Sequence, residues 1–216
     1  MLSILFLPVL SVFWWLAIII IATIGGWSLI PSKAKKIAIL GTKGAGKSTL
    51  FFKLGGYPIK PAESTKAKEI EEFKMKKPNG DTITIAATKD FGGEDIYVRQ
   101  YQEVIEKGTF IHFLINAKDD LYNKKGELNN RPIEITSRLR KIKQVVKNKG
   151  IKENDVGVNI IVTHLDEIAK SFGKTKEDVA LDLKKVLKKQ YDIINILIGN
   201  LNEDNFINEI KNRITG

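Results

Sequence analysis

The chain lacks cysteine altogether, shows no internal repeat, and carries no charged side chain from Met1 to Ser32. Without cysteine it can form neither a disulfide framework nor a thiolate metal site, and it has no cysteine nucleophile. A reducing compartment fits this composition. The missing charge over residues 1–32 is a different kind of signal, because it coincides with a long apolar run.

The uncharged N-terminal run, ILFLPVLSVFWWLAIIIIATIGGW, is longer than the roughly 20 residues that a helix needs to cross a bilayer. We therefore expect a transmembrane anchor over residues 1–32 and a short basic linker over residues 33–36. Because the first charges are lysines directly after the run, the positive-inside rule predicts a single-pass membrane protein with the rest of the chain in the cytoplasm. A cleaved signal peptide is the alternative, since Ser32 and Ala34 bracket a small-residue cut site, but a basic n-region is missing.

Basic residues outnumber acidic residues by 35 to 25, which gives a formal net charge of +10. Such an excess suits an anionic partner, whether nucleic acid, phospholipid headgroups or an acidic protein. The alternative is a set of solvated helix faces, because the lysines lie in periodic helical segments and not in one block. No nucleic-acid-binding module is recognisable in the sequence, so nucleic acid is not an expected partner.

A glycine-rich loop follows the linker in the stretch KKIAILGTKGAGKSTLFFKL. Residues 37–40 form a short apolar strand, residues 47–54 favour a helix, and the loop between them fits the pattern G-x-x-x-x-G-K-[S/T]. Its backbone N–H groups and the helix N-terminus favour phosphate, Lys47 would reach the β and γ phosphates, and Ser48 would bind Mg²⁺. A flexible Gly/Lys loop is the alternative. The expected phosphate contacts are Gly41, Thr42, Lys43, Gly44, Ala45, Gly46, Lys47, Ser48 and Thr49.

The stretch DFGGED begins shortly after a predicted β-hairpin over residues 70–75 and 82–87. Asp90 lies just past the second strand, where a carboxylate close to the magnesium can hold a metal-bound water. Gly93 has no side chain, so its N–H can approach the γ phosphate. An ordinary Asp/Gly turn is the alternative when the stretch is taken alone.

These motifs resemble those of the Ras superfamily of GTPases, and most closely its Arf branch. The first motif is Gly41–Ser48, and the third, D-x-x-G in the superfamily and D-V-G-G-Q-D in many Arf relatives, is D-F-G-G-E-D over residues 90–95. The resemblance covers about residues 36–216, and the general plan also resembles the β subunit of the signal-recognition-particle receptor. It implies an α/β G domain over residues 37–216, with a three-layer P-loop NTPase fold and a mostly parallel six-stranded sheet that has helices on both faces.

Alternating strand and helix patterns agree with that fold. Further apolar strands are expected over residues 110–115, 158–162 and 193–198. Further helices are expected over Asp95–Lys107, Pro132–Lys149, Lys176–Gln190 and Glu203–Ile214. His112 lies inside an apolar strand and lacks a partner at metal-ligand spacing in the sequence, so we expect it to be structural.

The family's base-reading motif, [N/T]-K-x-D, corresponds here to T-H-L-D from Thr163 to Asp166. A carboxylate at Asp166 can accept hydrogen bonds from the N1–H and the exocyclic amine of guanine, whereas adenine offers an unprotonated N1 and is disfavoured. His164 replaces the usual lysine, and its ring could stack on the base instead. A helix-capping stretch is the alternative. Gly199 and Asn200 occupy the place of the family's weak S-A motif, with a plain turn as the alternative.

Two further positions follow from the resemblance. Thr65 lies after Ser48 at nearly the spacing of the family's switch threonine, which binds Mg²⁺ and senses the γ phosphate; Ser64 and a simple mobile loop are the alternatives. Glu94 stands where Arf relatives carry the glutamine that orients the attacking water. Because a carboxylate adds like-charge repulsion and lacks the amide donor, we expect slow intrinsic hydrolysis. Asp95 is expected to face solvent.

The sequence thus predicts a membrane-anchored small GTPase, a GTP/GDP-dependent switch that docks a protein partner and is helped by an activating protein. The expected catalytic residues are Lys47, Thr65, Gly93 and Glu94, and the expected Mg²⁺ ligands are Ser48, Thr65 and Asp90. A nucleotide-binding pseudo-GTPase scaffold is the leading alternative, because Glu94 and His164 depart from the family pattern. An ATP-using enzyme is a second alternative, for which the sequence shows no lid or substrate motif.

Overall fold

The computed structural model describes residues 34–55, 67–92, 95–129, 133–187 and 195–215. The predicted anchor over residues 1–32 lies outside these ranges, and so does Lys33 of the predicted linker. Within the described ranges, no helix is both long and apolar enough to cross a membrane. This finding contradicts the predicted single-pass membrane localisation with a cytoplasmic G domain, and we withdraw that prediction.

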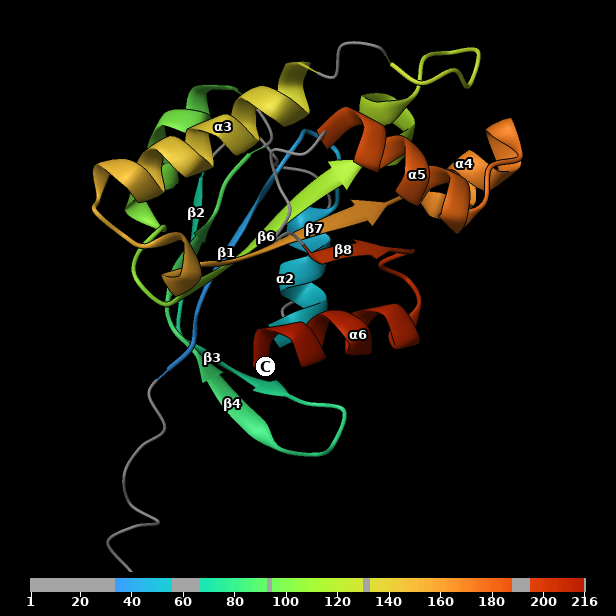
Figure 1. Cartoon of the computed structure of the whole chain (residues 1–216). Coiled ribbons are helices and arrows are strands. Elements are labelled where there is room, and N and C mark those ends of the chain that lie inside the picture. The colour runs from blue at the N-terminus through green and yellow to red at the C-terminus, as the bar shows by residue number, and fades with distance from the viewer. Residues whose placement is uncertain (1–33, 56–66, 93–94, 130–132, 188–194, 216) are drawn as a thin grey trace, which may run out of the picture. The chain divides into compact units, whose positions relative to one another are not determined.

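A parallel sheet of four strands lies at the centre of the described fold (Figure 1). Its strands are β1 (Lys36–Gly41), β6 (Thr109–Asn116), β7 (Gly157–Thr163) and β8 (Asn195–Ile198), hydrogen-bonded in that order. The register places Leu40 beside Phe113 and Phe113 beside Ile160. These three side chains form one apolar row across the sheet, and all three belong to the same core.

Alternate residues of the strands enter two separate cores, because successive side chains of a strand point to opposite faces. In β1, Ala38 and Leu40 belong to one core, and Ile37 and Ile39 belong to the other. Each fully buried Leu or Ile contributes about 1.5–3 kcal/mol. Burial on both faces explains why these strands appear in the sequence as continuous apolar runs and not as alternating ones.

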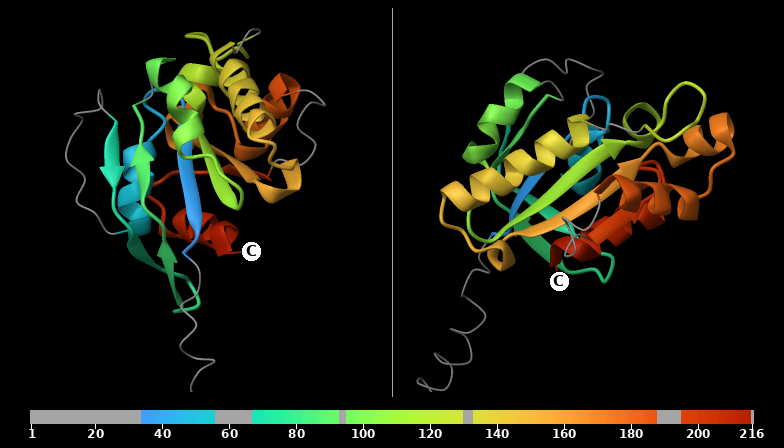
Figure 2. Two further views of the ribbon diagram at one scale, coloured as in Figure 1. Left: turned by 90° about the vertical axis from the view of Figure 1, so that its left-hand side faces the viewer. Right: turned by 45° about the horizontal axis from the view of Figure 1, so that its top comes forward.

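Helices cover both faces of the sheet. They are α2 (Lys47–Gly55), α3 (Ile133–Asn148), α4 (Leu165–Phe172), α5 (Lys176–Leu187) and α6 (Asp204–Thr215), with the 3₁₀- and π-helical elements η1 (Asp95–Glu103), η2 (Ala117–Leu121) and η3 (Glu153–Asp155). α2 and α6 share the core of Ile37 and Ile39, whereas η1, α3, α4 and α5 share the core of Ala38 and Leu40 (Figures 1 and 2). The described part therefore has the three-layer α/β arrangement that the sequence predicted.

Two antiparallel pairs accompany the parallel sheet. They are β2 (Lys68–Ile70) with β5 (Thr88–Asp90), and β3 (Phe73–Lys76) with β4 (Thr82–Ile85). The second pair confirms the predicted hairpin. Beside β1, the Thr88 hydroxyl of β5 donates to the Ile37 carbonyl at 3.0 Å. β4 meets the residue before β1 only through an isolated bridge between Lys35 and Ile85. The parallel sheet has four strands among the described residues, which corrects the predicted six-stranded sheet.

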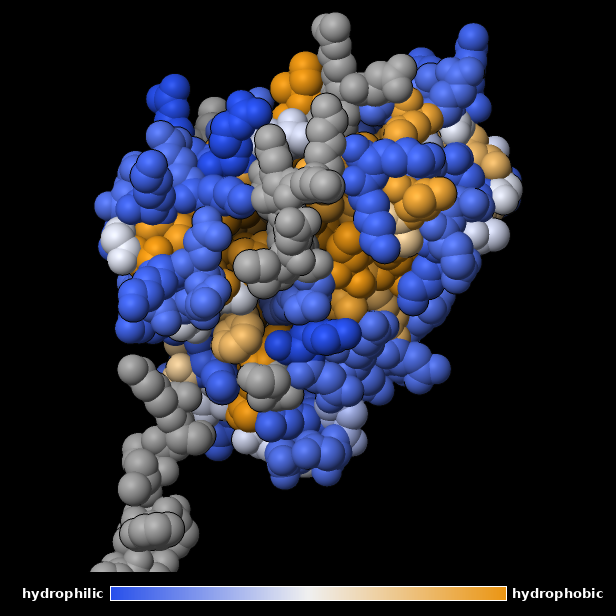
Figure 3. All heavy atoms as spheres, viewed as in Figure 1, coloured by the Kyte–Doolittle hydropathy of each residue, from blue (hydrophilic) through white to orange (hydrophobic). Residues whose placement is uncertain are grey.

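The local conformation of three segments also differs from expectation. The predicted helix over residues 95–107 is a 3₁₀-helix that ends at Glu103. A short π-helix, η2, and the helix α4 were not predicted. In the face shown in Figure 3, the outer helices carry mainly hydrophilic residues, and apolar residues gather in the middle of the view. All three segments nevertheless contribute buried residues to the core of Ala38 and Leu40.

Candidate functional site

The glycine-rich loop runs from the end of β1 to the start of α2, as its sequence predicts. Gly41 has φ +143°, and a Cβ added there would lie 2.1 Å from the carbonyl oxygen of Leu114. Gly46 has φ +84°, and its Cβ would lie 2.6 Å from a methyl group of Leu201. Gly41 therefore requires glycine because a side chain would force the loop away from the backbone of β6, and Gly46 requires it because of its positive φ.

Lys47, the first residue of α2, turns its ammonium group back into the loop. Its Nζ donates to the Thr42 carbonyl at 2.6 Å and approaches the Gly41 carbonyl at 3.5 Å. The residue is only 7% exposed. Burial lowers the pKa of Lys47 to about 8, although the Asp90 carboxylate acts in the opposite direction. A desolvated cation held by two carbonyls gains much by meeting an anion at this place.

Ser48 and Asp90 bring two oxygen atoms together next to that lysine. The Ser48 hydroxyl donates to Asp90 Oδ2 at 2.5 Å. The other carboxylate oxygen, Oδ1, is buried and has no hydrogen-bond partner among the described residues. Burial raises the pKa of Asp90, against the lowering effects of the Ser48 hydrogen bond and of Lys47. A buried carboxylate oxygen without a donor, beside a serine hydroxyl, fits Mg²⁺, which prefers oxygen ligands and keeps several waters.

The base-reading motif contacts the loop through Thr163, the last residue of β7. Its Oγ1 lies 3.1 Å from the carbonyl oxygen of Ala45 and 3.1 Å from that of Ile115. Since carbonyls can only accept, the hydroxyl directs its one proton toward them, and its oxygen also lies 2.8 Å from Nδ1 of His164. Thr163 is almost fully buried, so this contact joins β7 to the middle of the loop.

His164 directs the chain from β7 into α4. It has φ +62°, in the left-handed region, and it makes no side-chain hydrogen bond as the N-cap. The four residues from Thr163 to Asp166 therefore lie at a helix N-terminus, as the capping alternative expected. The same turn brings the exposed Asp166 to the carboxyl end of the sheet, where the base-reading alternative expected it.

Asp166 meets the segment that follows β8. Its backbone N–H donates to Asn200 Oδ1 at 3.1 Å, and Asn200 Nδ2 donates to Glu203 at 2.6 Å. Gly199 donates its N–H to the Val162 carbonyl at 3.1 Å. The structure thus brings the two predicted base-reading segments side by side, at the same end of the sheet as the glycine-rich loop.

The remaining predicted residues divide into described and undescribed ones. Lys43 and Gly44 are exposed on the loop, Ala45 is buried, and Thr49 is half-buried on α2. The predicted switch and catalytic positions Thr65, Gly93 and Glu94, and the alternative Ser64, lie outside the described residues. Their roles stay predictions.

Asp120 is a contact of the loop that the sequence did not single out. Its Oδ2 accepts from the Thr42 hydroxyl at 2.5 Å and from the Asn116 N–H at 2.8 Å. Burial raises the pKa of Asp120 to about 6. No sequence motif includes Asp120. Its position just after an expected strand is the one sequence signal that could have indicated it.

Arg138 is a second contact that the sequence did not reveal. Its side chain is 2% exposed, on the apolar face of α3. Nη1 donates to the Gly41 carbonyl at 3.2 Å, and Nη2 pairs with Asp95 at 3.0 Å and with Glu134 at 2.9 Å. The one sequence signal was an arginine at a position where the helical period calls for an apolar residue.

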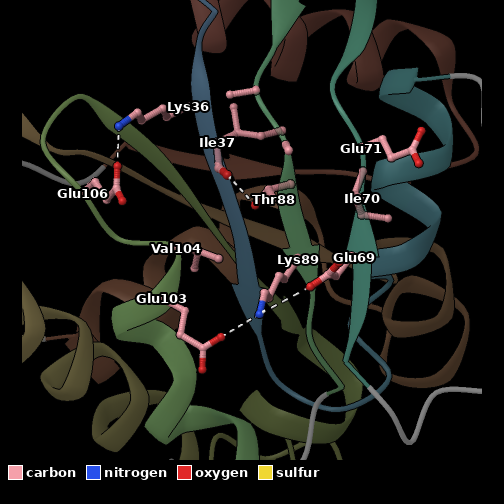
Figure 4. A pocket seen from close by; sticks show the side chains of 12 residues that line it. Lys36, Ile37, Glu69, Ile70, Glu71, Thr88, Lys89, Glu103, Val104 and Glu106 are labelled. Atoms are coloured by element: carbon pink, nitrogen blue, oxygen red, sulfur yellow. Dashed lines mark hydrogen bonds and ion pairs between the residues drawn. The ribbon is translucent and has the colours of Figure 1, made fainter.

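A separate hollow of about 370 Å³ lies beside β1, β2, β5 and the end of η1 (Figure 4). No residue of the glycine-rich loop lines it. Lys36 pairs with Glu106, and Lys89 pairs with Glu103 at 2.8 Å and more weakly with Glu69. Because both lysines already face carboxylates, the hollow is not an anion site like the loop.

Comparisons with known proteins agree with the fold. No protein-family model matches the chain, and no curated protein sequence matches it. The solved structure of Methanosarcina barkeri Roco2 RocCORdC bound to GDP is similar with a TM-score of 0.55 and 18% identity, over 86% of this chain and 49% of that one. A bacterial selenocysteine-specific elongation factor, EF-Sec, is similar with a TM-score of 0.55 and 17% identity, over 85% of this chain and 28% of that one.

The chain therefore spans about half of the first of these structures and less than a third of the second. At such low identity the likeness shows the fold alone. That fold is the P-loop GTPase fold, and the four-stranded parallel sheet with its glycine-rich loop is consistent with it.

Proposed function

We propose that this chain is a guanine-nucleotide switch, a small GTPase that binds GTP with Mg²⁺ and docks a protein partner while the triphosphate is bound. The contact between Thr163 and the Ala45 carbonyl carries the proposal. It ties the expected base-reading motif directly to the expected phosphate loop. A nucleotide whose phosphates lie in the loop has its base within reach of the segment that contains Asp166.

The phosphate end of the proposed site rests on Lys47, Ser48 and Asp90. Lys47 exchanges the Thr42 carbonyl for the β and γ phosphates, which is favourable for a buried ammonium group. Ser48 and Asp90 would hold Mg²⁺, the serine directly and the carboxylate through water. Bound there, Mg²⁺ would supply positive charge against the phosphates.

The base end of the proposed site selects guanine. The Asp166 carboxylate is exposed and its backbone is held by Asn200, so two oxygen atoms are available to the N1–H and the amine of guanine. Adenine would leave that carboxylate without a donor, and unpaired polar groups discriminate strongly. The resemblance to the Arf branch and the GDP-bound structural neighbour support the same choice of base.

The base assignment is tested by titrating the full chain with GTP, GDP and ATP in the presence of Mg²⁺. We predict that Asp166→Asn weakens GTP binding about 100-fold, because two hydrogen bonds to a charged group are lost. Glu167→Gln is the matched control, since Glu167 is the next residue and pairs with Lys118 at the surface. It should stay within about twofold of the unaltered chain.

Competition by ATP at the same concentration as GTP would contradict the guanine assignment. Equal losses in Asp166→Asn and Glu167→Gln would contradict the role of Asp166. Either result would leave the P-loop GTPase fold in place and remove the proposed specificity.

The hydrolysis rate separates the switch from a second candidate function, a pseudo-GTPase scaffold. His164 favours the scaffold, since a histidine with a left-handed backbone conformation stands where the family has lysine. We propose slow hydrolysis, because Glu94 replaces the water-orienting glutamine. A single-turnover assay of the full chain should release phosphate faster than free GTP does, and no release in the presence of a docked partner would favour the scaffold.

A further inference from the structure

We propose that Arg138 is a positioning residue that couples the glycine-rich loop to η1, so that the proposed nucleotide site and the start of η1 respond to each other. The inference rests on the proposed function, since it concerns regulation of the same site. One guanidinium group contacts both elements: Nη1 bonds the loop at Gly41 and approaches the buried Tyr101 hydroxyl of η1 at 3.5 Å, and Nη2 bonds Asp95, the first residue of η1.

The first step is that Arg138 holds the peptide plane at which the loop begins. The Gly41 carbonyl accepts from Arg138 Nη1 at 3.2 Å, and the N–H of the same peptide, on Thr42, donates to the Leu114 carbonyl at 3.1 Å. The plane is therefore held on both sides. Lys47 also approaches this carbonyl, at 3.5 Å, and a phosphate would draw the lysine away from it.

The second step is that the other end of the guanidinium faces carboxylates on two different elements. Nη2 lies 3.0 Å from Asp95 on η1 and 2.9 Å from Glu134 on α3. Glu134 is on the same helix as Arg138, so that pair links nothing beyond α3. The guanidinium group is rigid and planar, so Nη1 and Nη2 move together. A shift of the Gly41 peptide therefore changes the direction of the hydrogen bond that Nη2 donates to Asp95.

The third step is an asymmetry of burial. The Arg138 side chain is 2% exposed, whereas the Asp95 side chain is 90% exposed. A buried cation cannot lose its partners cheaply, but an exposed carboxylate can return to water at little cost. Asp95 is therefore the mobile partner of the contact. Its expected solvent exposure is confirmed, and the hydrogen bond to a buried arginine is the part that the sequence did not show.

The fourth step gives the direction of the coupling. Lys47 Nζ and Arg138 Nη1 both approach the Gly41 carbonyl, at 3.5 Å and 3.2 Å, so the two cations repel each other when no anion is present. Triphosphate in the loop removes that repulsion and favours the guanidinium at Gly41, which presents Nη2 to Asp95. By thermodynamic linkage, the hydrogen bond between Asp95 and Arg138 then raises the affinity for the triphosphate by the same factor.

The test is a measurement of GTP and GDP affinities for the full chain, Asp95→Asn and Glu134→Gln. Asp95→Asn should lower the ratio of GTP to GDP affinity about fivefold or more, because the link from loop to η1 loses its charge. Glu134→Gln removes a carboxylate from the same guanidinium without touching η1, and it should leave the ratio unchanged. If Arg138 had only a structural role, the substitutions would weaken the binding of GTP and of GDP equally.

Arg138→Lys provides an additional variant that keeps the charge. A lysine cannot hydrogen-bond Gly41 and Asp95 at the same time. The ratio of GTP to GDP affinity in Arg138→Lys should therefore match the ratio in Asp95→Asn, and combining the two substitutions should lower the ratio no further. An unchanged ratio in Asp95→Asn, or an equal change in Glu134→Gln, would overturn the inference while leaving the proposed function standing. Failure of the unaltered chain to bind either nucleotide would instead remove the proposed function, and the inference with it.

Discussion

At the scale of single residues, the site depends on side chains whose charge is partly desolvated. Lys47 is held by carbonyls, Asp90 has one buried oxygen without a donor among the described residues, and Asp120 accepts from a loop threonine. Burial lowers the pKa of Lys47 and raises the pKa of Asp90 and of Asp120, so it favours the neutral form of each group. Such groups gain most from meeting an opposite charge.

His112 gives a residue-scale prediction that concerns stability. It is fully buried on β6, its Nδ1 lies 3.4 Å from Asn159 Nδ2, and its Nε2 has no partner among the described residues. Burial lowers the pKa of His112 to about 4, from an ordinary value of 6.5. Between those values the unfolded chain takes up a proton that the folded chain refuses, so stability is complete above pH 6.5 and falls as the pH falls toward 4.

We predict that this histidine accounts for up to about 3 kcal/mol of lost stability between pH 7 and pH 4. His112→Leu should reduce the pH dependence by that amount. Urea unfolding of both chains at several pH values measures the difference, and the comparison cancels the carboxylates that the two chains share. Equal slopes of unfolding free energy against pH in both chains would show that His112 is not the cause.

At the scale of elements, the approach of β1 to β6 sets the shape of the glycine-rich loop. Gly41 pairs with Leu114 in the ladder, and no Cβ fits between them. Gly41→Ala should therefore destabilise the fold by about 3 kcal/mol or more, since β1 and β6 must separate. Gly80→Ala is the matched control, because Gly80 also has a positive φ but has no atom within 4 Å of an added Cβ.

The control should cost only about 1–2 kcal/mol, the usual penalty of a left-handed conformation. Thermal or denaturant unfolding of the two variants measures both values. A similar loss in both would show that the backbone conformation matters at Gly41 and that the contact with β6 does not.

Several elements could be predicted because their signals are local. The strands over residues 110–115 and 158–162 are apolar runs buried on both faces, and the hairpin has a turn with Asn79 and Gly80. The 3₁₀ character of η1 and the pairing of β2 with β5 could not be predicted, since packing against distant segments decides them. The same holds for the side-chain hydrogen bond from Thr88 to the Ile37 carbonyl of β1.

At the scale of the whole molecule, the glycine spacing and the order of motifs predicted the P-loop GTPase fold and the end of the sheet where the candidate site lies. Arg138 was not predicted as a functional residue, because a buried arginine on an apolar helix face has no sequence motif. The predicted membrane localisation was wrong, because no helix among the described residues is long and apolar enough to cross a bilayer. Distances across the fold, and not residue order, therefore revealed how α3 and η1 relate to the loop.

The most direct test of the whole proposal is isothermal titration of the full chain with GTP and Mg²⁺, beside Lys47→Ala and Lys53→Ala. Both lysines belong to α2, but only Lys47 faces the loop carbonyls. We predict saturable binding by the unaltered chain and by Lys53→Ala, and a loss of about 100-fold in Lys47→Ala. Absence of binding by the unaltered chain, or unchanged binding by Lys47→Ala, would contradict the proposed nucleotide site.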